Sequence, residues 1–454
     1  MKLDIFLVKE VNDKLLTYFE NLELFNELIE LNKFDGKENQ KIFIPLSLSK
    51  NKNRSLLVGT NGCSDSYDFV KLGAVVGDML KEDYEIEIHN LDTESNLYSF
   101  EFGVYISEYK FDQFQNDKSE RHSIKVLDSI NSLEIQNKIK SIFWVRDMVN
   151  FPALTKTPEF FTDKVLDLTK NLEINVHVYE EDWLKENNFG GVLGVASGSE
   201  RRPKFLVGEY NQNAKTQISL IGKGVLFDSG GLSLKSPSGM ETMKTDMAGA
   251  ATAWAVIVLL AKQGVDVGLK VYTPLVENMP SGSAIRPGDV LHMRNGKTIE
   301  VVNTDAEGRL IMADALAFAS ESKPDLICDV ATLTGSAYVA LGVDIGAVFS
   351  NNSEIMSKFL SANELSHEIY HSLPLEKQYK KLIKSDIADM KNSGGSFGGA
   401  ITAALLLEEF VNNIDWVHLD IAGPARSRDN DPVHSKGGTG FGVLGLYNFF
   451  SKLT

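Results

Sequence analysis

Cysteine is scarce in this sequence. Cys63 and Cys328 are its only cysteines among 454 residues, whereas small secreted proteins that depend on disulfides are rich in them. Two cysteines in so long a chain cannot form a disulfide framework, and Cys328 lies in an apolar run that favours a buried thiol. This composition fits a reducing cytosol, so we expect a cytoplasmic protein.

Basic residues are also fewer than acidic residues. The chain has 46 Lys and Arg against 62 Asp and Glu, which gives a net charge of −16. Nucleic acids and anionic membranes are bound mainly through basic patches, so this balance argues against both as the main partner. The apolar stretch 248–261 is shorter than the roughly 20 residues that a membrane-spanning helix needs. The charged N-terminal segment lacks a cleavage site and predicts a first β-strand rather than a signal peptide.

Hydrophobic residues, by contrast, are ample at 43%, with 24% charged residues. These fractions are typical of globular proteins, and 454 residues exceed what one core usually spans. We therefore expect two domains. Residues 1–130 alternate short β-type runs with a helical pattern at 67–81, which predicts a small N-terminal α/β domain. Residues 131–150 are predicted to form a linking helix that stops before Pro152, because the residue before proline disfavours helix.

Residues 151–454 are predicted to form the larger domain. Continuous apolar runs there resemble strands that are buried on both faces. Between them, residues 248–262 and 310–321 have the pattern of covering helices. We therefore predict a mixed, mainly parallel sheet sandwiched by helices. The predicted strands are residues 218–221, 268–274, 299–302, 326–332 and 416–421.

Several common catalytic motifs are absent. Residues 296–298 match the end of a phosphate-binding P-loop, but Leu291 stands where the upstream glycine is required. The sequence contains no G-x-G-x-x-G opening a helix after a strand, no G-x-S-x-G, no H-E-x-x-H and no C-x-x-C. A nucleotide site, a serine nucleophile of that type and a zincin site are therefore disfavoured.

Carboxylates and lysines are instead concentrated in glycine-rich segments. In the segment 221–235 a strand leads to Lys223, Asp228 precedes a glycine pair, and Lys235 follows. A tight turn with an Asp cap would account for this segment equally well. Asp246 precedes a long Ala-rich helix, and a plain helix N-cap is the alternative there.

A third segment contributes two more carboxylates. Asp305 and Glu307 are two residues apart, so in an extended segment both point to one side. They follow the predicted strand 299–302, and ligands of open α/β sheets bind beyond the carboxyl ends of strands. Two carboxylates on one side repel each other unless a cation or proton lies between them. Together the four carboxylates suit one or two divalent ions, and the lysines and Arg309 suit an oxyanion or an anionic cofactor.

These residues resemble the leucine aminopeptidase (cytosol aminopeptidase) family. Residues 303–310, NTDAEGRL, match that family's signature octapeptide without a substitution. The segments 223–235 and 243–250 match too, as do 331–335, 385–389, 398–404 and 418–424. The resemblance is strong over about residues 140–454 and weak before them. It implies a C-terminal two-metal catalytic domain and a smaller, macrodomain-like N-terminal domain.

The resemblance also implies a role for each site residue. Two divalent ions per subunit are expected, Mn or Zn, with Mg or Co as alternatives, and Asp228 and Glu307 would bridge them. Lys235 would polarise the scissile carbonyl, and Arg309 would hold a bicarbonate ion as general base. The implied metal ligands are Lys223, Asp228, Asp246, Asp305 and Glu307. The implied substrate-binding residues are Met243, Thr332, Leu333, Gly335 and Ala422.

The activity that follows from the resemblance is hydrolysis of the N-terminal residue, Leu-like or other, from peptides. A hydroxide bridging the metals would attack the carbonyl. The family also implies a homohexamer. Two alternatives stay open: a narrower dipeptidase, for instance of Cys-Gly, and an additional role as a DNA-binding regulator, against which the charge of −16 speaks.

Overall fold

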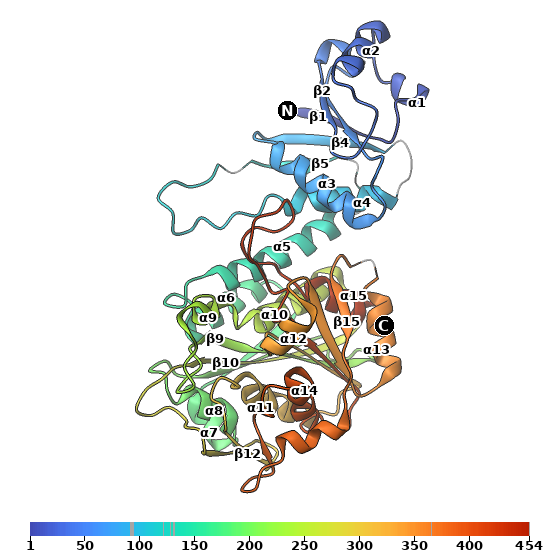
Figure 1. Cartoon of the computed structure of the whole chain (residues 1–454). Coiled ribbons are helices and arrows are strands. Elements are labelled where there is room, and N and C mark those ends of the chain that lie inside the picture. Colours follow the sequence, from blue (N-terminus) through green and yellow to red (C-terminus); the bar gives the residue numbers. More distant parts are fainter. Residues whose placement is uncertain (91–94, 121, 128, 130–131, 365, 454) are drawn as a thin grey trace. The chain divides into compact units, whose positions relative to one another are not determined.

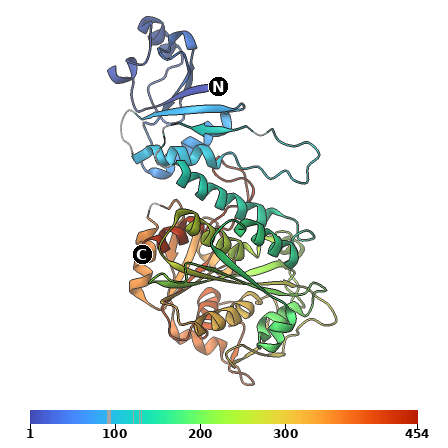
Figure 2. The same cartoon turned by 180° about the vertical axis from the view of Figure 1, so that it is seen from behind.

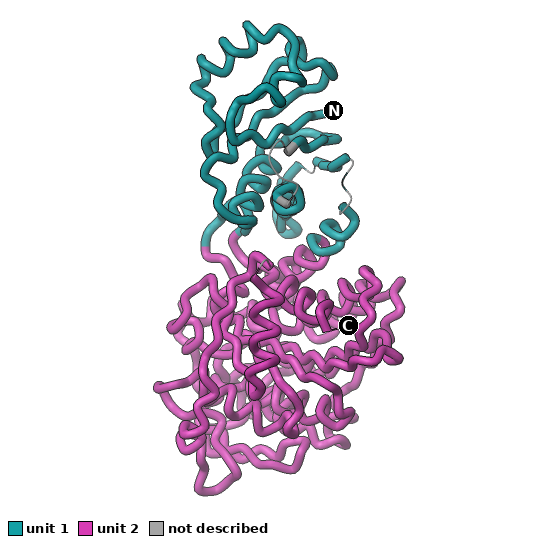
Figure 3. The backbone as a smooth tube through the Cα atoms, turned by 90° about the vertical axis from the view of Figure 1, so that its right-hand side faces the viewer, with its two compact units in different colours: residues 1–139, 429–435 teal, residues 140–428, 436–454 magenta. Residues whose placement is uncertain are grey.

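The computed structural model describes residues 1–90, 95–120, 122–127, 129, 132–364 and 366–453. The chain divides into two compact units (Figure 3). Unit 1 comprises residues 1–139 and 429–435, and unit 2 comprises residues 140–428 and 436–454. The division falls inside helix α5 (Ser132–Asn150). The predicted boundary between residues 130 and 131 lies outside the described residues.

Unit 1 is built on a five-stranded sheet in the order β2-β3-β1-β4-β5. Only β2 runs antiparallel to its neighbour. The strands are β1 (Lys2–Val8), β2 (Lys41–Ile44), β3 (Arg54–Gly59), β4 (Tyr84–Asn90) and β5 (Ile124–Val126). The helices are α1 (Asp13–Leu16), α2 (Leu22–Leu31), the short η1 (Leu46–Leu48), α3 (Ser66–Met79) and α4 (Ser95–Ile106).

Helices α3 and α4 approach each other through glycines. A Cβ atom at Gly73 would lie 2.1 Å from the carbonyl oxygen of Phe100, and one at Gly103 would lie 2.1 Å from that of Val70. Only glycine permits this spacing, so the contact fixes where the two helices cross. A separate core contains Phe6, Phe19 and Phe25 and fills the space between the sheet, α1 and α2.

Unit 2 contains a nine-stranded sheet in the order β15-β14-β17-β13-β8-β10-β7-β6, with β9 also pairing with β10. The central pairs are parallel, while β6, β7 and the β14–β17 pair are antiparallel. This arrangement confirms the predicted mixed, mainly parallel sheet. Its strands are β6 (Ile174–Tyr179), β7 (Lys204–Tyr210), β8 (Gln217–Gly222), β9 (Gly224–Asp228), β10 (Gly268–Asn278), β13 (Leu326–Ala331), β14 (Ile345–Ser350), β15 (Ile369–Ser372) and β17 (Trp416–Asp420).

Helices cover both faces of this sheet, as predicted. Helix α10 packs with α15 on one face, and α11 packs with α8 and α14 on the other (Figures 1 and 2). These helices are α8 (Gly190–Ala196), α10 (Ala248–Gln263), α11 (Gly308–Glu321), α14 (Gly399–Glu408) and α15 (Val443–Ser451). The remaining helices are α6 (Pro158–Thr169), α7 (Glu181–Glu186), α9 (Pro237–Met240), η2 (Met243–Thr245), α12 (Gly335–Leu341), α13 (Ser353–Ala362) and η3 (Lys377–Ile383).

One apolar helical stretch in the described chain, Pro237–Gln263, is long enough to cross a membrane. Its most apolar window is 89% buried inside the protein. The core helix of a globular protein has the same property, and α10 packs against β8, β10 and β13 of the sheet and against α15. The stretch is therefore weak evidence for a membrane span.

The predicted strand at residues 299–302 is not part of the large sheet. The structure forms β12 (Thr298–Glu300) instead, between β11 (Val290–His292) and β16 (Met390–Lys391) in a separate three-stranded sheet. Only Ile299 of β12 is buried, so the strand has one covered face. The apolar run indicated a strand correctly but did not reveal which sheet it joins.

Candidate active site

The carboxyl ends of the central strands carry the first site residues. Lys223 directly follows β8, and Asp228 ends β9. One carboxylate oxygen of Asp228, Oδ1, accepts hydrogen bonds from the backbone N–H of Gly230 and from Asn278 Nδ2, both at 2.8 Å. Gly230 adopts φ +87°, a conformation that suits glycine. These contacts fix the Asp228 side chain and leave its Oδ2 available to other groups.

Asp305 and Glu307 lie in a tight turn rather than in the extended segment that the sequence predicted. Glu307 has helical backbone angles of φ −76° and ψ −35° directly before α11. Asn392 orders the turn, since its Nδ2 donates to the carbonyl oxygen of Asn303 at 2.6 Å. The structure nevertheless brings the two carboxylates together. Ligand oxygens of Asp228, Asp305 and Glu307 all lie within 4.8 Å of one another.

Two lysines lie among these carboxylates. Lys223 Nζ is 2.8 Å from Asp246 Oδ1 and 3.0 Å from Glu307 Oε1. Lys235 Nζ is 2.7 Å from Asp228 Oδ2 and 2.6 Å from Asp305 Oδ1. The five predicted metal ligands and Lys235 therefore form one cluster.

Burial makes it costly to ionise every carboxylate of this cluster. It raises the pKa of Glu307 to about 8, with help from the negative charge of Asp228. Burial likewise raises the pKa of Asp246 to about 6, against the lowering effect of Lys223. Among the described residues, Asp246 Oδ2 and Glu307 Oε2 are buried and have no hydrogen-bond partner. Four carboxylates in one cluster, with partnerless buried oxygens on Asp246 and Glu307, suit divalent cations, so the residues present fit a metal centre.

A cavity of about 420 Å³ opens over this cluster. Its walls include the predicted metal ligands, Lys235 and the five predicted substrate-binding residues. Further residues line the cavity that the sequence did not predict. Two of them, Arg426 and Arg428, closely follow the segment 418–424, which matches the family. The newly found lining residues are Ser238, Gly239, Thr242, Thr245, Thr334, Tyr338, Val343, Gly423, Ala425, Arg426 and Arg428.

Arg309 stands apart from the other predicted residues. It is not among the described residues that line the cavity, and only 7% of it is exposed. Its Nη1 donates to the carbonyl oxygen of Asn392 at 2.7 Å, while its Nε is buried without a hydrogen-bond partner in the described chain. Burial lowers its pKa to about 10. The backbone N–H of Leu333 donates to Asp420 Oδ1 at 3.1 Å.

Asp420 organises the loops at the far wall of the cavity. Its two oxygens accept from the backbone N–H groups of Leu333 and Ala422, both at 3.1 Å, and from Thr334 Oγ1 at 2.7 Å. It is 1% exposed and sits at the end of β17. Asp420 lies inside the family-matched segment 418–424, which could have pointed to it, but no role was predicted for this residue.

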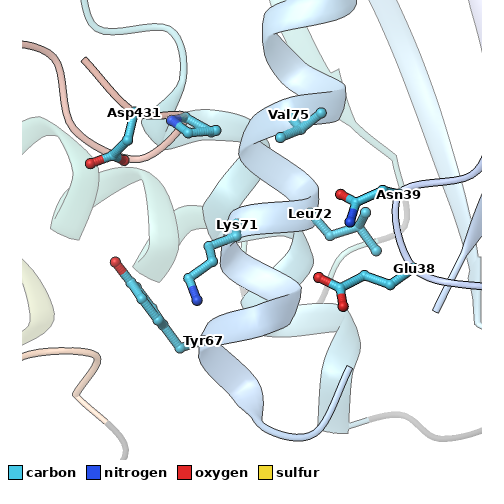
Figure 4. A pocket seen from close by; sticks show the side chains of 8 residues that line it. Glu38, Asn39, Tyr67, Lys71, Leu72, Val75 and Asp431 are labelled. Atoms are coloured by element: carbon cyan, nitrogen blue, oxygen red, sulfur yellow. The ribbon is translucent and has the colours of Figure 1, made fainter. Parts of the chain in front are cut away.

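Unit 1 has a cavity of its own, of about 400 Å³ (Figure 4). Glu38 and Asn39 lie on one side of α3 and Asp431 on the other. Lys71 Nζ lies 4.6 Å from the ring centre of Tyr67. The described lining contains none of the predicted site residues, and its charges have both signs.

The mixed α/β fold and the carboxylate–lysine cluster indicate a metal-dependent hydrolase. The model of the cytosol aminopeptidase family, catalytic domain, matches residues 143–447, and the chain belongs to this family. It is accordingly a metallo-aminopeptidase, an enzyme that removes N-terminal residues from peptides.

Two relatives align with most of this chain in sequence. A probable cytosol aminopeptidase of Syntrophotalea carbinolica is 42% identical over 77% of this chain and 74% of its own length. One of Rickettsia massiliae is 35% identical over 93% of this chain and 90% of its own length.

Two solved structures superpose on nearly the whole of this chain. The cytosol aminopeptidase from Coxiella burnetii superposes with a TM-score of 0.88 at 29% identity, covering 100% of this chain and 97% of that one. The bottromycin maturation enzyme BotP, in complex with Mn, superposes with a TM-score of 0.88 at 30% identity, covering 100% and 99%. The family identification from the sequence is confirmed.

Proposed function

We propose that this enzyme hydrolyses N-terminal Leu-like and other residues from peptides with two divalent ions, Mn or Zn, bound in the cluster. The gathering of five predicted ligands around unsatisfied carboxylate oxygens carries the proposal. Two bound ions would acidify a shared water and polarise the scissile carbonyl. The remaining roles belong to the side chains of the chain itself.

Each ligand has a position consistent with the role proposed for it. Asp228, beside Lys235, and Glu307, beside Lys223, would help to hold both ions. Lys223 and Asp246 would complete one site and Asp305 the other. As a ligand, Lys223 must be neutral, and the nearby positive charge of metal ions favours loss of its proton.

Lys235 would stabilise the negative charge that develops on the substrate carbonyl. Its side chain is 17% exposed, and Nζ lies between Asp228 and Asp305 at the wall of the cavity. A cation that is already in place beside the developing negative charge lowers the reaction barrier, because neither solvent nor protein has to reorganise during the reaction. Metal ions at the two carboxylates would free the ammonium group to face the substrate.

Arg309 would hold a bicarbonate ion that moves the proton to the leaving amine. The buried Nε of Arg309, which lacks a hydrogen-bond partner among the described residues, supports an anion there. The anion would also take the backbone N–H of Leu333 from Asp420. Arg309 would then position the base rather than touch the peptide.

Met243, Thr332, Gly335 and Ala422 would accept the first side chain of the peptide. Three of the four are small or apolar, which suits Leu-like residues. We also propose a homohexamer in the cytoplasm. The names of the curated relatives support the location, and the oligomer rests on family resemblance alone, so light scattering of the purified protein would test it.

The decisive experiment compares Lys235→Ala with the wild type. Turnover of a Leu-peptide should fall by at least about 100-fold, the range seen when one oxyanion donor is lost. Metal content should stay near normal, because removing an ammonium group does not weaken two carboxylate ligands. Lys215→Ala, at an exposed site, serves as control. Full activity of Lys235→Ala would refute the assignment, and a panel with Leu-Gly and Cys-Gly would show the breadth of specificity.

A further inference from the structure

A second group of candidate ligands lies on the sheet of unit 1. Asp4 of β1 pairs in register with Glu87 of β4, and Phe6 pairs with His89. Side chains two residues apart on a strand share a face, so Asp4, Glu87 and His89 lie together on one face of the sheet. One ligand atom from each lies within 4.8 Å of the others. None of the three belongs to the catalytic cluster, which lies in unit 2.

The polar atoms of this group are close but not hydrogen-bonded to one another. His89 Nε2 is 3.9 Å from Asp4 Oδ1 and 3.7 Å from Glu87 Oε1, beyond hydrogen-bond range. Within the described chain, Asp4 Oδ2 and His89 Nε2 are buried without a hydrogen-bond partner. Asp4 itself is only 2% exposed.

Ser55 adds an independent unsatisfied group at the same place. It pairs with Asp4 in the register of β1 and β3, so it faces the same side of the sheet. It is 0% exposed, and its Oγ is buried with no hydrogen-bond partner among the residues that the structure describes. Native proteins leave few buried polar groups unpaired because each is costly. Three such atoms on one face of the sheet suit a ligand that would pair with them.

Two of the three side chains are already held in place. The imidazole of His89 stacks on Phe6 with ring centres 4.6 Å apart, and Tyr18 lies 5.1 Å away on another side. Asn53 Nδ2 donates to Asp4 Oδ1 at 3.2 Å. The Glu87 side chain is 44% exposed, which leaves it free to adjust and leaves solvent access on its side.

We propose that Asp4, Glu87 and His89 bind one Zn²⁺ ion in unit 1, with water at the open position and Ser55 close by. One imidazole nitrogen with carboxylate oxygens is a ligand set that Zn²⁺ accepts, and three protein ligands leave room for water. The Asp4 and Glu87 oxygens lie 3.9 and 3.7 Å from His89 Nε2, close to the spacing of ligand atoms around a tetrahedral Zn²⁺ ion, so small side-chain movements would bring them to the ion. The ion would tie β1 to β4 and stabilise the sheet of unit 1.

The test counts zinc ions on the full-length protein. After chelation, the wild type, Asp4→Asn and His89→Gln are titrated with Zn²⁺, and bound zinc is measured by mass spectrometry. The wild type should bind one equivalent more than either variant. Aminopeptidase turnover should be the same in all three, which separates this site from the catalytic one.

His122→Gln is the matched control, since His122 Nε2 lies 3.7 Å from Glu120, whose side chain is 88% exposed. It should keep the full zinc content. Glu87→Gln, at a partly exposed position with little risk to folding, should weaken the additional site by about tenfold or more. Equal zinc content and affinity in the wild type and in Glu87→Gln would overturn the proposal, even if Asp4→Asn or His89→Gln fails to fold.

Discussion

Gly308 of the octapeptide makes room for the side chain of Lys223. An added Cβ would lie 2.4 Å from Lys223 Cε and 2.6 Å from Nζ, so any larger residue would force the lysine side chain to shift. From family motifs the sequence predicted a common site for Lys235 and the five proposed ligands, and the structure places these residues in one cluster. It did not reveal the turn at Asp305 and Glu307, because Asn392, which orders that turn, is far away in the sequence.

Gly308→Ala should therefore damage the site without unfolding the protein. The methyl group would displace Lys223 from Asp246 and Glu307, and a shift of about 1 Å can cost on the order of 100-fold in rate. Turnover and unfolding temperature are measured together. Gly282→Ala is the control, since no described atom lies within 4 Å of its added Cβ. Normal turnover in Gly308→Ala would mean that Lys223 can move without loss.

At the scale of elements, a buried lysine fixes the short helix η2 that precedes Asp246. Lys156 is 0% exposed, and its Nζ donates to the carbonyl oxygens of Met148 at 2.8 Å and Lys244 at 2.5 Å. Lys244 Nζ in turn donates to the carbonyl oxygen of Asn150 at 2.6 Å. The apolar patterns of α10 and β8 predicted those elements well, but no pattern indicates such lysine–carbonyl contacts, because they join loops distant in sequence.

Lys156→Met should loosen η2 and with it Asp246. The substitution leaves buried carbonyl oxygens unpaired, at about 1–3 kcal/mol each, and misplaces a metal ligand. We expect a lower unfolding temperature and turnover reduced by about tenfold to 100-fold. Lys170→Met, at an exposed position, should change neither. If Lys156→Met lowers only the unfolding temperature, η2 does not depend on this lysine for its position.

Glu108, just beyond α4, should make the stability of the protein depend on pH. Burial raises the pKa of Glu108 to about 7, opposed by one hydrogen bond from the backbone N–H of Ile124. The folded state thus holds this proton more tightly than the unfolded chain, whose pKa is near 4.5. The resulting stabilisation is full below about pH 4.5 and is lost as the pH rises through about 7.

Glu108→Gln cannot titrate, so it isolates this contribution. Between about pH 5 and pH 8 the unfolding temperature of the wild type should fall by about 2–4 °C relative to that of the variant. Other charged groups line the same cleft and remain in both proteins, so their titration cancels in the difference. They are Asp78, Lys81, Lys110, Glu120 and His122. A difference that does not change with pH would contradict the raised pKa.

At the scale of the whole molecule, the chain forms two compact units, and each contains a hydrophobic cluster of its own. The length of the sequence predicted two domains, and the first was expected at residues 1–130. The division inside α5 and the return of residues 429–435 to unit 1 could not be predicted. The helical pattern of α5 does not show where its contacts change from one unit to the other. The segment 429–435 is a short loop, and it has no hydrophobic periodicity that would assign it to a unit.

Separate cores should give two unfolding transitions in calorimetry of the full chain. Mn²⁺ added to chelated protein should bind the folded catalytic cluster and so raise the transition of unit 2. Phe25→Ala removes a fully buried ring that stacks on Phe19 at 4.6 Å in the core of unit 1. It should cost about 3–5 kcal/mol and lower only the other transition. If Phe25→Ala and Mn²⁺ instead move one and the same transition, the two units unfold as a single cooperative structure.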